Sequence, residues 1–489
     1  MRRRKALKQI GLGVTAGLAL PAWLSSCEKE RPGPEINYDG VVGIIGAGAA
    51  GLIAADILIS KGVKVKVFEA NNRVGGRVCS LHRTDAPSDS LIMFPNNYPY
   101  SDFPFELGAD RINGSNSKWG EILKIRKVPT VNFRTLSADR YVLNDVVKTE
   151  TEALLNADFA TAKGFRDNFS TFTGSASLSV QQAATNAGVA AGMQQLVNSW
   201  LGIPYGSSHN RIGANALANA LSLIEHDGIE LTLSNNPMQD TLLSVYSRVI
   251  PSIQFNAVVQ SVNYAGDLIE ITHSAGSHTV NKLIVTVPVS ILKAGDIAFS
   301  PGLPASKLSA MSRIGMEASM RVLIEFKRNF WGEDVAAIIG STESPMMLNA
   351  GVGRSTLNKA LSITINGPKA EAFSLMTGDE VVESIIAEMD VWFNGDATEN
   401  VRRSTLAGEE NKLLYTIKDW TKDPFAKGGF SFPLTGGIPA DRETLAAPVD
   451  GKLFFAGEAT DTTGEFGTIS GALKSGERAA FEVIDEIVA

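Results

Sequence analysis

The chain has 489 residues, of which 44% are hydrophobic and 20% are charged, and its formal net charge is −7. It is too long for one simple core, so we expect two intertwined domains of ordinary globular composition. The acidic balance argues against a nucleic-acid partner. Beyond residue 26 the sequence contains no apolar stretch of transmembrane length.

Residues 1–39 have the pattern of an export signal followed by a tether. Arg3 and Arg4 lie in a basic start that resembles the twin-arginine motif, and Leu24 to Cys27 resemble a bacterial lipobox. We therefore expect twin-arginine export, membrane lipid attached at Cys27, and a periplasmic or cell-surface lipoprotein. The alternative is an accidental basic start with a buried cysteine. If Cys27 is acylated, Cys79 has no partner and no disulfide is expected.

A nucleotide-binding βαβ unit is indicated next. A β-branched run, Val41 to Ile45, leads into Gly46, Gly48 and Gly51 with G-x-G-x-x-G spacing, and a helix is expected from about Ala49 to Lys61. Gly46 permits the tight turn, Gly48 leaves room for a pyrophosphate, and Gly51 lets the helix pack closely on the strand. The helix N-terminus then offers an anion site.

Glu69 follows the second predicted strand, which contains Val63, Val65 and Val67. It lies 23 residues after Gly46, near the spacing expected for a carboxylate that binds a ribose. An acid at this place favours a free 2′-hydroxyl over a 2′-phosphate.

The segment that starts at Glu69 resembles the E-A-x-x-R-x-G-G-R segment of the flavin amine oxidase family, which includes monoamine, polyamine and L-amino-acid oxidases. Residues Phe105 to Ile112 (FELGADRI), the run from Asn256 to Trp331, and Leu453 to Thr460 with its F-A-G-E turn continue this resemblance in the same order. The resemblance covers most of residues 40–489.

The resemblance implies an α/β fold with FAD as cofactor. A Rossmann-like, discontinuous FAD-binding domain of the GR2 type would comprise residues 40–116, 236–300 and 426–489. An interleaved α+β substrate domain would comprise residues 117–235 and 301–425.

The resemblance also assigns roles around the flavin. The arginines after Glu69 would balance the diphosphate charge, the Val259 backbone would face the adenine, and Glu458 would contact the ribityl chain. The last helix, expected from Gly471 to Val488, would point its positive N-terminus at the flavin pyrimidine ring. The residues implied to bind FAD are Gly46, Gly48, Ala49, Ala50, Gly51, Glu69, Ala70, Arg73, Gly76, Arg77, Gly108, Ala109, Asp110, Arg111, Val259, Gly457, Glu458, Thr468 and Ile469.

Arg111 stands where the amino-acid oxidase branch of the family carries an arginine that clamps the substrate carboxylate. The alternative is a salt bridge from Arg111 to Asp110 or Glu106.

The sequence departs from the family at three places. Arg321 stands ten residues before Trp331, where the family usually has a lysine that holds water near flavin N5. Gly429 stands where monoamine oxidases attach the flavin through cysteine, so FAD should be noncovalent. The two aromatic walls of the amine cage become Phe430 and Thr468, which leaves room for a bulkier substrate or for a side chain from elsewhere.

The remaining segments predict helices and strands but no site residues. Residues 117–235 are mostly helical in pattern, with alanine-rich runs such as Val180 to Trp200. We expect a hairpin from Leu268–His273 and Thr279–Thr286, half-buried strands around Val322 to Phe326 and Leu361 to Ile365, and a core-facing helix from Asp379 to Trp392.

The histidines of the sequence give no clear catalytic or metal signal. His209 and His226 fit solvated surface positions. His82, His273 and His278 show no ligand spacing, so no metal is expected.

These features favour an FAD-dependent oxidase that uses molecular oxygen and acts on an amine, most plausibly an L-α-amino acid. Its catalytic candidates are Arg111, Arg321, Phe430 and Thr468. The alternatives are an oxidase of simple amines or polyamines, a desaturase with the same cofactor fold, and a lipid-anchored flavoprotein that has lost its activity. A monomer and a homodimer both remain open.

Replacing Arg3 and Arg4 by lysine should retain the protein in the cytoplasm, because the two arginines are the recognised pair of the export signal. Cys27→Ala should release the exported protein from the membrane, because the lipid anchor would be lost. Cell fractionation and immunoblotting measure both effects. A Cys27→Ala variant that stays equally membrane-bound would show that the lipobox interpretation is wrong.

Overall fold

The computed structural model describes residues 36–81, 105–132, 134–135, 137–234, 236–352 and 359–489. The predicted export signal, Cys27 and most of the tether lie outside these residues. Within them, none of the helices is both long and apolar enough to cross a bilayer.

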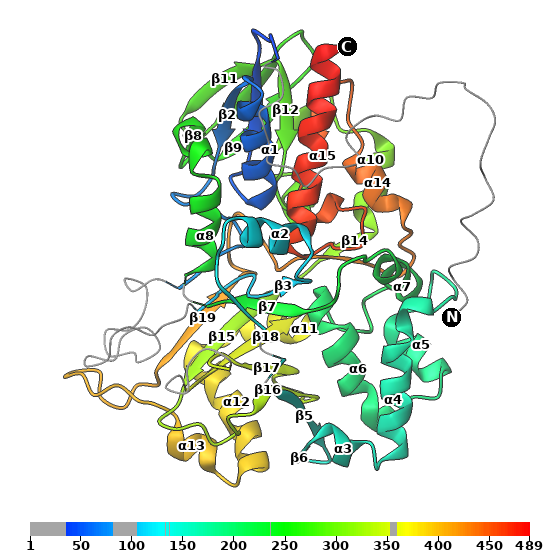
Figure 1. Ribbon diagram of the computed structural model, residues 1–489, viewed down its shortest axis with the longest axis vertical. Helices are drawn as coiled ribbons and strands as arrows, with labels where there is room; N and C mark the ends of the chain where they lie inside the picture. The colour runs from blue at the N-terminus through cyan, green and yellow to red at the C-terminus, as the bar shows by residue number, and fades with distance from the viewer. Residues whose placement is uncertain (1–35, 82–104, 133, 136, 235, 353–358) are drawn as a thin grey trace, which may run out of the picture.

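A parallel five-stranded sheet in the order β21-β12-β1-β2-β8 organises the upper part of the molecule (Figure 1). Its β-branched residues are buried on both faces, as parallel sheets require. Ile44 packs towards helices α1 and α15, and its neighbour Ile45 packs towards a second sheet, β11-β10-β9-β13. The elements of this part are β1 (Val41–Ile45), α1 (Ala49–Ser60), β2 (Lys64–Phe68), β8 (Ile253–Gln254), β9 (Val259–Asn263), β10 (Ile269–His273), β11 (Gly276–Val280), β12 (Lys282–Val285), β13 (Ala298–Ser300), β21 (Leu453–Phe455) and α15 (Ile469–Val488).

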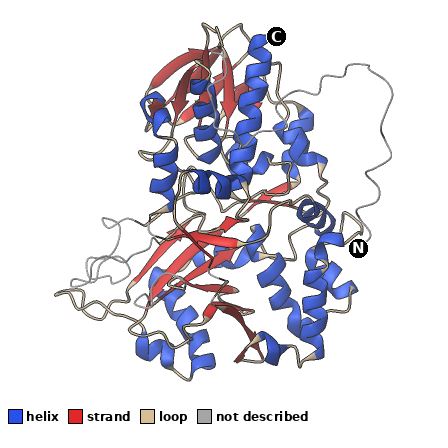
Figure 2. Cartoon of the chain, in the orientation of Figure 1, coloured by secondary structure: helices blue, strands red, loops and turns tan. Residues whose placement is uncertain are grey.

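A seven-stranded sheet in the order β19-β15-β18-β17-β16-β5-β6 forms the lower part, and helices cover both of its faces (Figure 2). One apolar cluster joins the sheet to α12, and another joins it to α4, α5, α6 and α7. The elements are β5 (Ala138–Leu143), β6 (Val146–Lys148), α3 (Glu150–Ala153), α4 (Ala157–Asp167), α5 (Val180–Asn186), α6 (Gln194–Leu201), α7 (Ala214–Ser222), β15 (Ser319–Glu325), β16 (Val335–Ile339), β17 (Met346–Asn349), β18 (Ala360–Asn366), α11 (Pro368–Ser374), α12 (Gly378–Phe393), α13 (Asp396–Asn400) and β19 (Tyr415–Asp419).

Short elements lie between the two parts. A three-stranded sheet in the order β3-β7-β4 and a two-stranded sheet of β14 and β20 occupy this middle layer (Figure 1). The elements not yet named are β3 (Ile112–Asn113), α2 (Lys118–Ile125), β4 (Thr130–Asn132), β7 (Glu230–Leu233), α8 (Met238–Val245), α9 (Val289–Ala294), α10 (Ala305–Ser312), β14 (Ile314–Met316), β20 (Ser431–Pro433) and α14 (Ala440–Ala446).

The predicted α/β class with a Rossmann-like unit is confirmed, as are the strand, helix and strand after Val41 and the helix α12. Two strand predictions need correction. The run Thr279–Thr286 is two strands, because β11 closes the hairpin with β10 while β12 joins the parallel sheet beside β1. The strands β15 and β18 are buried along their whole length rather than half-buried, because α11 and α12 pack on one face while non-helical segments that include Phe105, Leu107 and Trp420 pack on the other.

The helical predictions are confirmed with different limits. Residues 180–200 form two helices, α5 and α6, which are separated by Gly188 with a φ of +85°. The last helix begins at Ile469, two residues earlier than expected. Residues 117–235 also contribute the strands β4 to β7 in addition to helices.

The close packing of α15 on α1 should require a glycine at position 476, where the two helices cross. A Cβ at this position would overlap the Ala50 carbonyl oxygen and lie 2.7 Å from Ile53 Cγ2. Gly476→Ala should therefore lower the free energy of unfolding by about 1–3 kcal/mol through overpacking, although alanine favours helix by about 1 kcal/mol. Gly164→Ala is the matched control, because Gly164 lies exposed in α4 and its added Cβ meets nothing within 4 Å.

The measurement is urea unfolding of both variants followed by circular dichroism. Gly164→Ala should be neutral or stabilising. Equal stability of Gly476→Ala and the native protein would contradict the close helix crossing.

Candidate active site

The glycine turn after β1 leaves an open groove. Gly46 has a φ of +104°, and a Cβ at Gly51 would overlap the Gly46 carbonyl oxygen. In contrast, a Cβ at Gly48 would meet only Gly75 O, at 3.9 Å, and a Cβ at Gly76 would meet only Gly48 Cα, at 3.7 Å. The groove between Gly48 and Gly76 can therefore admit a ligand against bare backbone.

The N-terminus of α1 opens at this groove. No side chain caps the helix, and its first turn, which includes Ala49 and Ala50, contains no acid. Unpaired amides and a positive dipole end suit a diphosphate. The residues present therefore fit the phosphate part of FAD.

Glu69 is fixed at the end of β2, beside the same turn. Its Oε2 accepts a hydrogen bond from Ala47 N at 2.7 Å, and its Oε1 accepts one from Asn71 N at 2.8 Å. The backbone of Glu69 also contacts the segment that leads into β9, because Ala257 N donates a hydrogen bond to Glu69 O at 2.8 Å. The buried Val259 follows two residues later. This carboxylate is rigid and suitably placed for ribose hydroxyls, with Ala70 next to it.

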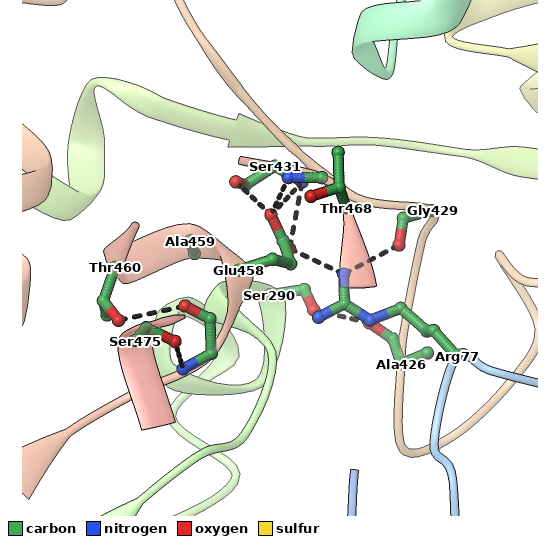
Figure 3. Close-up of polar contacts among 12 residues, drawn as sticks. Arg77, Ser290, Ala426, Gly429, Ser431, Glu458, Ala459, Thr460, Thr468 and Ser475 are labelled. Atoms are coloured by element: carbon green, nitrogen blue, oxygen red, sulfur yellow. Dashed lines mark hydrogen bonds and ion pairs between the residues drawn. The ribbon is translucent and has the colours of Figure 1, made fainter. Parts of the chain in front are cut away.

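Arg73 and Arg77 differ in their partners, and a role of Arg73 in balancing the diphosphate charge stays a prediction. Arg73 Nη2 donates to Gly76 O at 2.9 Å. Arg77 Nη1 donates to Gly429 O at 3.0 Å and to Glu458 Oε1 at 2.7 Å, so its charge neutralises a buried carboxylate (Figure 3).

Glu458 is the centre of a buried polar cluster. Besides Arg77, its carboxylate accepts hydrogen bonds from Ser431 Oγ at 2.6 Å and from Gly467 N at 2.9 Å (Figure 3). Burial opposes ionisation, but the charges of Arg77 and Arg442 and these hydrogen bonds outweigh it and hold the pKa of Glu458 below its usual value. The carboxylate is thus charged and already bonded to protein donors, and its contact with a ribityl chain stays a prediction.

Phe430 lies against the residue that precedes Thr468, because a Cβ at Gly467 would lie 2.6 Å from Phe430 Cδ2. The role of Phe430 and Thr468 as walls of an amine cage stays a prediction. Thr468 caps α15, because its Oγ1 accepts a hydrogen bond from Gly471 N at 2.9 Å and donates to Glu465 O at 2.7 Å. The Thr468 hydroxyl therefore fixes the start of the helix at Ile469, and the positive helix end lies beside Phe430.

Arg321 is locked against the predicted flavin-facing segment around Gly108 and Ala109. Its side chain is buried, and it donates to Asp110 Oδ2 at 2.9 Å, Gly108 O at 3.0 Å and Ser362 Oγ at 3.3 Å. A guanidinium stays charged at ordinary pH. Arg321 thus contributes a fixed charge that is compensated by Asp110.

Arg111 forms an ion pair that the sequence did not indicate. Its Nη1 donates to Glu230 Oε1 of β7 at 2.7 Å, so Asp110 and Glu106 are both wrong as partners. Arg134 Nε donates to Glu230 Oε2 at 2.8 Å. Burial alone would raise the pKa of Glu230, but the charges of Arg111 and Arg134 outweigh it and lower the pKa to about 2.

A small pocket that opens to solvent lies between this segment and the large sheet. One side carries charged groups, and the other side is mainly apolar. Its described lining residues are Phe105, Glu106, Asp110, Arg111, Thr232, Leu323, Ala336, Leu348, Asn349, Ala350, Val352 and Ser362. It is the best candidate for the substrate site, because it joins Arg111 and Asp110 to the neighbours of Arg321.

The histidine predictions are partly wrong. His209 is buried rather than solvated, its Nε2 lies 3.1 Å from Gln194 Oε1, and burial lowers its pKa to about 4. His273 and His278 hydrogen-bond each other at 3.0 Å. Throughout the described ranges no group of three His, Cys, Asp or Glu residues is arranged to hold a metal.

Sequence reasoning missed Glu230 and Ser431, which lie in no recognised motif. One pattern could have indicated a strand at Glu230, because polar and apolar residues alternate in Glu230–Leu233 shortly after Gly228. Its partner Arg111 is 119 residues away, and no local pattern connects the two.

Comparison with known proteins agrees with this geometry. The family model described as flavin containing amine oxidoreductase matches residues 49–484. Lysine-specific histone demethylase 1B of Mus musculus is 25% identical over 464 residues, which covers 92% of this chain and 53% of the relative. Polyamine oxidase 4 of Oryza sativa subsp. japonica is 30% identical over 213 residues, which covers 43% of this chain and 40% of the relative. The chain thus spans about half the length of the demethylase that it matches along most of its own sequence.

Solved structures share the fold. Cyclohexylamine oxidase from Brevibacterium oxydans IH-35A has a TM-score of 0.75 at 18% identity and covers 92% of this chain and 100% of its own. Putrescine oxidase bound to putrescine has a TM-score of 0.73 at 18% identity, and the match covers 91% of this chain and 99% of the putrescine oxidase chain.

FAD should be released completely when the holoprotein is precipitated with acid. Gly429 offers no sulfur, and a Cβ there would lie 2.6 Å from Ser319 Cβ, so even a cysteine would need rearrangement. The measurement is the flavin absorbance of the supernatant and of the pellet. Yellow colour that stays with the pellet would contradict noncovalent binding.

Proposed function

Since the chain belongs to the flavin-containing amine oxidoreductase family and carries FAD, we propose that it oxidises a cationic amine that has no α-carboxylate. The single observation that carries this proposal is the Arg111–Glu230 ion pair. Among the described residues that line the cavity, Arg111 is the cation, and a carboxylate already neutralises it.

The charges around the cavity support this choice. Its described lining includes Glu106 and Asp110, and Asp110 is compensated by Arg321. Arg111 is likewise paired with a carboxylate, that of Glu230. A substrate carboxylate would therefore meet cations that are already paired, which favours an amine without a carboxylate.

The fold relatives support the same substrate class. The two solved structures are named for cyclohexylamine and putrescine, which are amines without a carboxylate. Their fold alone does not fix a substrate.

The chemistry follows from the cofactor. FAD, held by the backbone at Gly48 and Gly76 and by Glu69, would supply the oxidising power for the C–N bond, with oxygen as the final acceptor. The protein contributes position and electrostatics. The apolar side of the cavity excludes water, and the α15 N-terminus at Thr468 favours negative charge.

An L-α-amino acid is the second candidate, because Arg111 does line the cavity. A substrate carboxylate would then have to displace or share the Glu230 interaction. Peroxide release on a panel of amines and amino acids tests activity itself. A desaturase or an inactive flavoprotein would release none.

Arg111→Met separates the two candidates. If Arg111 bound a substrate carboxylate, the variant would lose a charged hydrogen-bond pair worth about 2–5 kcal/mol. The KM for an amino acid would then rise far more than the KM for its decarboxylated amine. We expect instead that phenethylamine is preferred over phenylalanine by the native enzyme. The ratio of the two kcat/KM values should change by less than about threefold, since about 1.4 kcal/mol is tenfold.

Arg134→Met is the matched control. Arg134 also pairs with Glu230, but it is not among the described residues that line the cavity. Both variants therefore disturb Glu230, and only Arg111→Met changes the wall. A preference for phenylalanine that Arg111→Met removes and Arg134→Met keeps would establish the amino-acid candidate.

A further inference from the structure

Arg442 of α14 contacts three segments that surround the candidate cofactor site. Its Nη1 donates hydrogen bonds to Ser431 Oγ and to Ala459 O, both at 2.9 Å. Its guanidinium also lies over the Phe466 ring, 4.1 Å from the ring centroid. Ser431 belongs to β20, Ala459 to the 3₁₀ helix Glu458–Thr460, and Phe466 to the turn before α15. One side chain therefore holds these three segments together.

All three contacts lead to the buried Glu458 carboxylate. Ser431 Oγ accepts the hydrogen bond from the guanidinium and donates its own proton to Glu458 Oε2 at 2.6 Å (Figure 3). Ala459 follows Glu458 in the chain, so the second hydrogen bond fixes the backbone that carries this acid. The third contact lies next to Gly467, whose N–H donates to Glu458 Oε2 at 2.9 Å.

Arg442 is also one of two cations that act on this carboxylate. Burial opposes the charge of Glu458, but the charges of Arg77 and Arg442 outweigh it and hold the pKa below its usual value. Burial lowers the pKa of Arg442 to about 10, so its guanidinium is charged at neutral pH. Arg77 binds the carboxylate directly, whereas Arg442 contacts it through the Ser431 hydroxyl.

The other charged groups on the segments around Glu458 have partners of their own or face solvent. Glu443 of α14 is exposed, and Asp461 accepts hydrogen bonds from Thr463 Oγ1 and Glu465 N. The remaining groups form the ion pairs Asp441–Arg313, Glu465–Lys474, Glu477–Lys118 and Arg478–Glu482. Within the described residues, Arg77 and Arg442 are thus the cations that support the ionised acid.

We propose that Arg442 is a positioning residue for the cofactor, which holds Glu458, Ser431 and the start of α15 in the arrangement that receives FAD. A guanidinium suits this task, because its planar donor group serves two acceptors while its face stacks on a ring. The role concerns cofactor binding and is independent of the amine that is oxidised. It also extends the site to α14, a helix that carries none of the residues implied to bind FAD.

Arg442→Gln and Arg442→Lys separate the hydrogen bonds of this residue from its charge. Glutamine keeps a donor for Ser431 or Ala459 but is neutral, whereas lysine keeps the charge and loses the planar donor group. The measurement is the dissociation constant of FAD from about pH 8 to about pH 5, obtained from the flavin fluorescence that appears when the holoprotein is diluted. Circular dichroism at each pH establishes that the protein is folded.

The native protein should bind FAD with nearly constant affinity over this range, because a carboxylate with a lowered pKa stays ionised until the pH falls through that pKa. In Arg442→Gln the carboxylate loses one of its two cations, so its pKa rises and protonation begins within the range. The dissociation constant should then rise by about tenfold towards the acid end, since one pKa unit corresponds to a tenfold change. Arg442→Lys should keep the affinity constant with pH to within about threefold.

Arg313→Gln is the matched control. Arg313 binds the same helix through Asp441, but neither its hydrogen bonds nor its charge reaches Glu458. This variant should bind FAD as the native protein does at every pH. Native affinity of Arg442→Gln throughout the range would overturn the proposal. A loss that is equal at every pH and is shared by Arg442→Lys and Arg313→Gln would overturn it by showing a structural role, and so would an affinity of Arg442→Lys that falls with acid.

Discussion

The buried carboxylate of Glu458 connects segments that are far apart in the sequence. Arg77 reaches it from the glycine loop after β2, Ser431 reaches it from β20, and Gly467 reaches it from the turn before α15. Arg442 adds a further hydrogen bond to the Ser431 hydroxyl. Because a buried charge that loses a partner costs about 3–5 kcal/mol, these segments are strongly constrained to meet in one arrangement. The cofactor groove, the Phe430 ring and the end of α15 all take their relative positions from this cluster.

A second constraint is the close approach of backbones around the nucleotide-binding unit. Gly51 lets α1 lie against the turn after β1, and Gly476 lets α15 lie against α1. Both are positions where a methyl group would meet a main-chain oxygen. The residues near the start of α15, which include Thr468, are therefore held relative to the groove by packing as well as by the Glu458 cluster. Rigid placement of this kind is what a cofactor site requires, since a small displacement there changes the reacting geometry.

The sequence predicted the structure most accurately where a motif consists of residues that are neighbours in the chain. The glycine spacing after β1, the acid at Glu69 and the F-A-G-E turn each combine neighbouring residues, and the structure shows the expected local arrangement. The errors arose where distant contacts decide. Arg111 pairs with Glu230 across 119 residues, and β15 and β18 are buried on both faces because α12 covers one face and distant segments that include Phe105 and Trp420 cover the other. Likewise, Asn281 exchanges hydrogen bonds with Val41 at the point where the chain leaves β11 and enters the parallel sheet as β12. The alternation of hydrophobic residues in Thr279–Thr286 does not indicate this change of sheet.

The pairing of charges around the cavity shows how this protein differs from one designed to bind a carboxylate. Arg321 is compensated by Asp110, and Arg111 shares Glu230 with Arg134, so neither cation of the flavin-facing segment carries its charge alone. An α-carboxylate would have to compete with a carboxylate that is already desolvated and held by two guanidinium groups. An ammonium group meets no such competition, and the acidic and aromatic groups near it lower the cost of its desolvation. In the proposed function, the electrostatics of the wall would select for the charge of the amine, and the shape of the apolar side would select for its carbon skeleton.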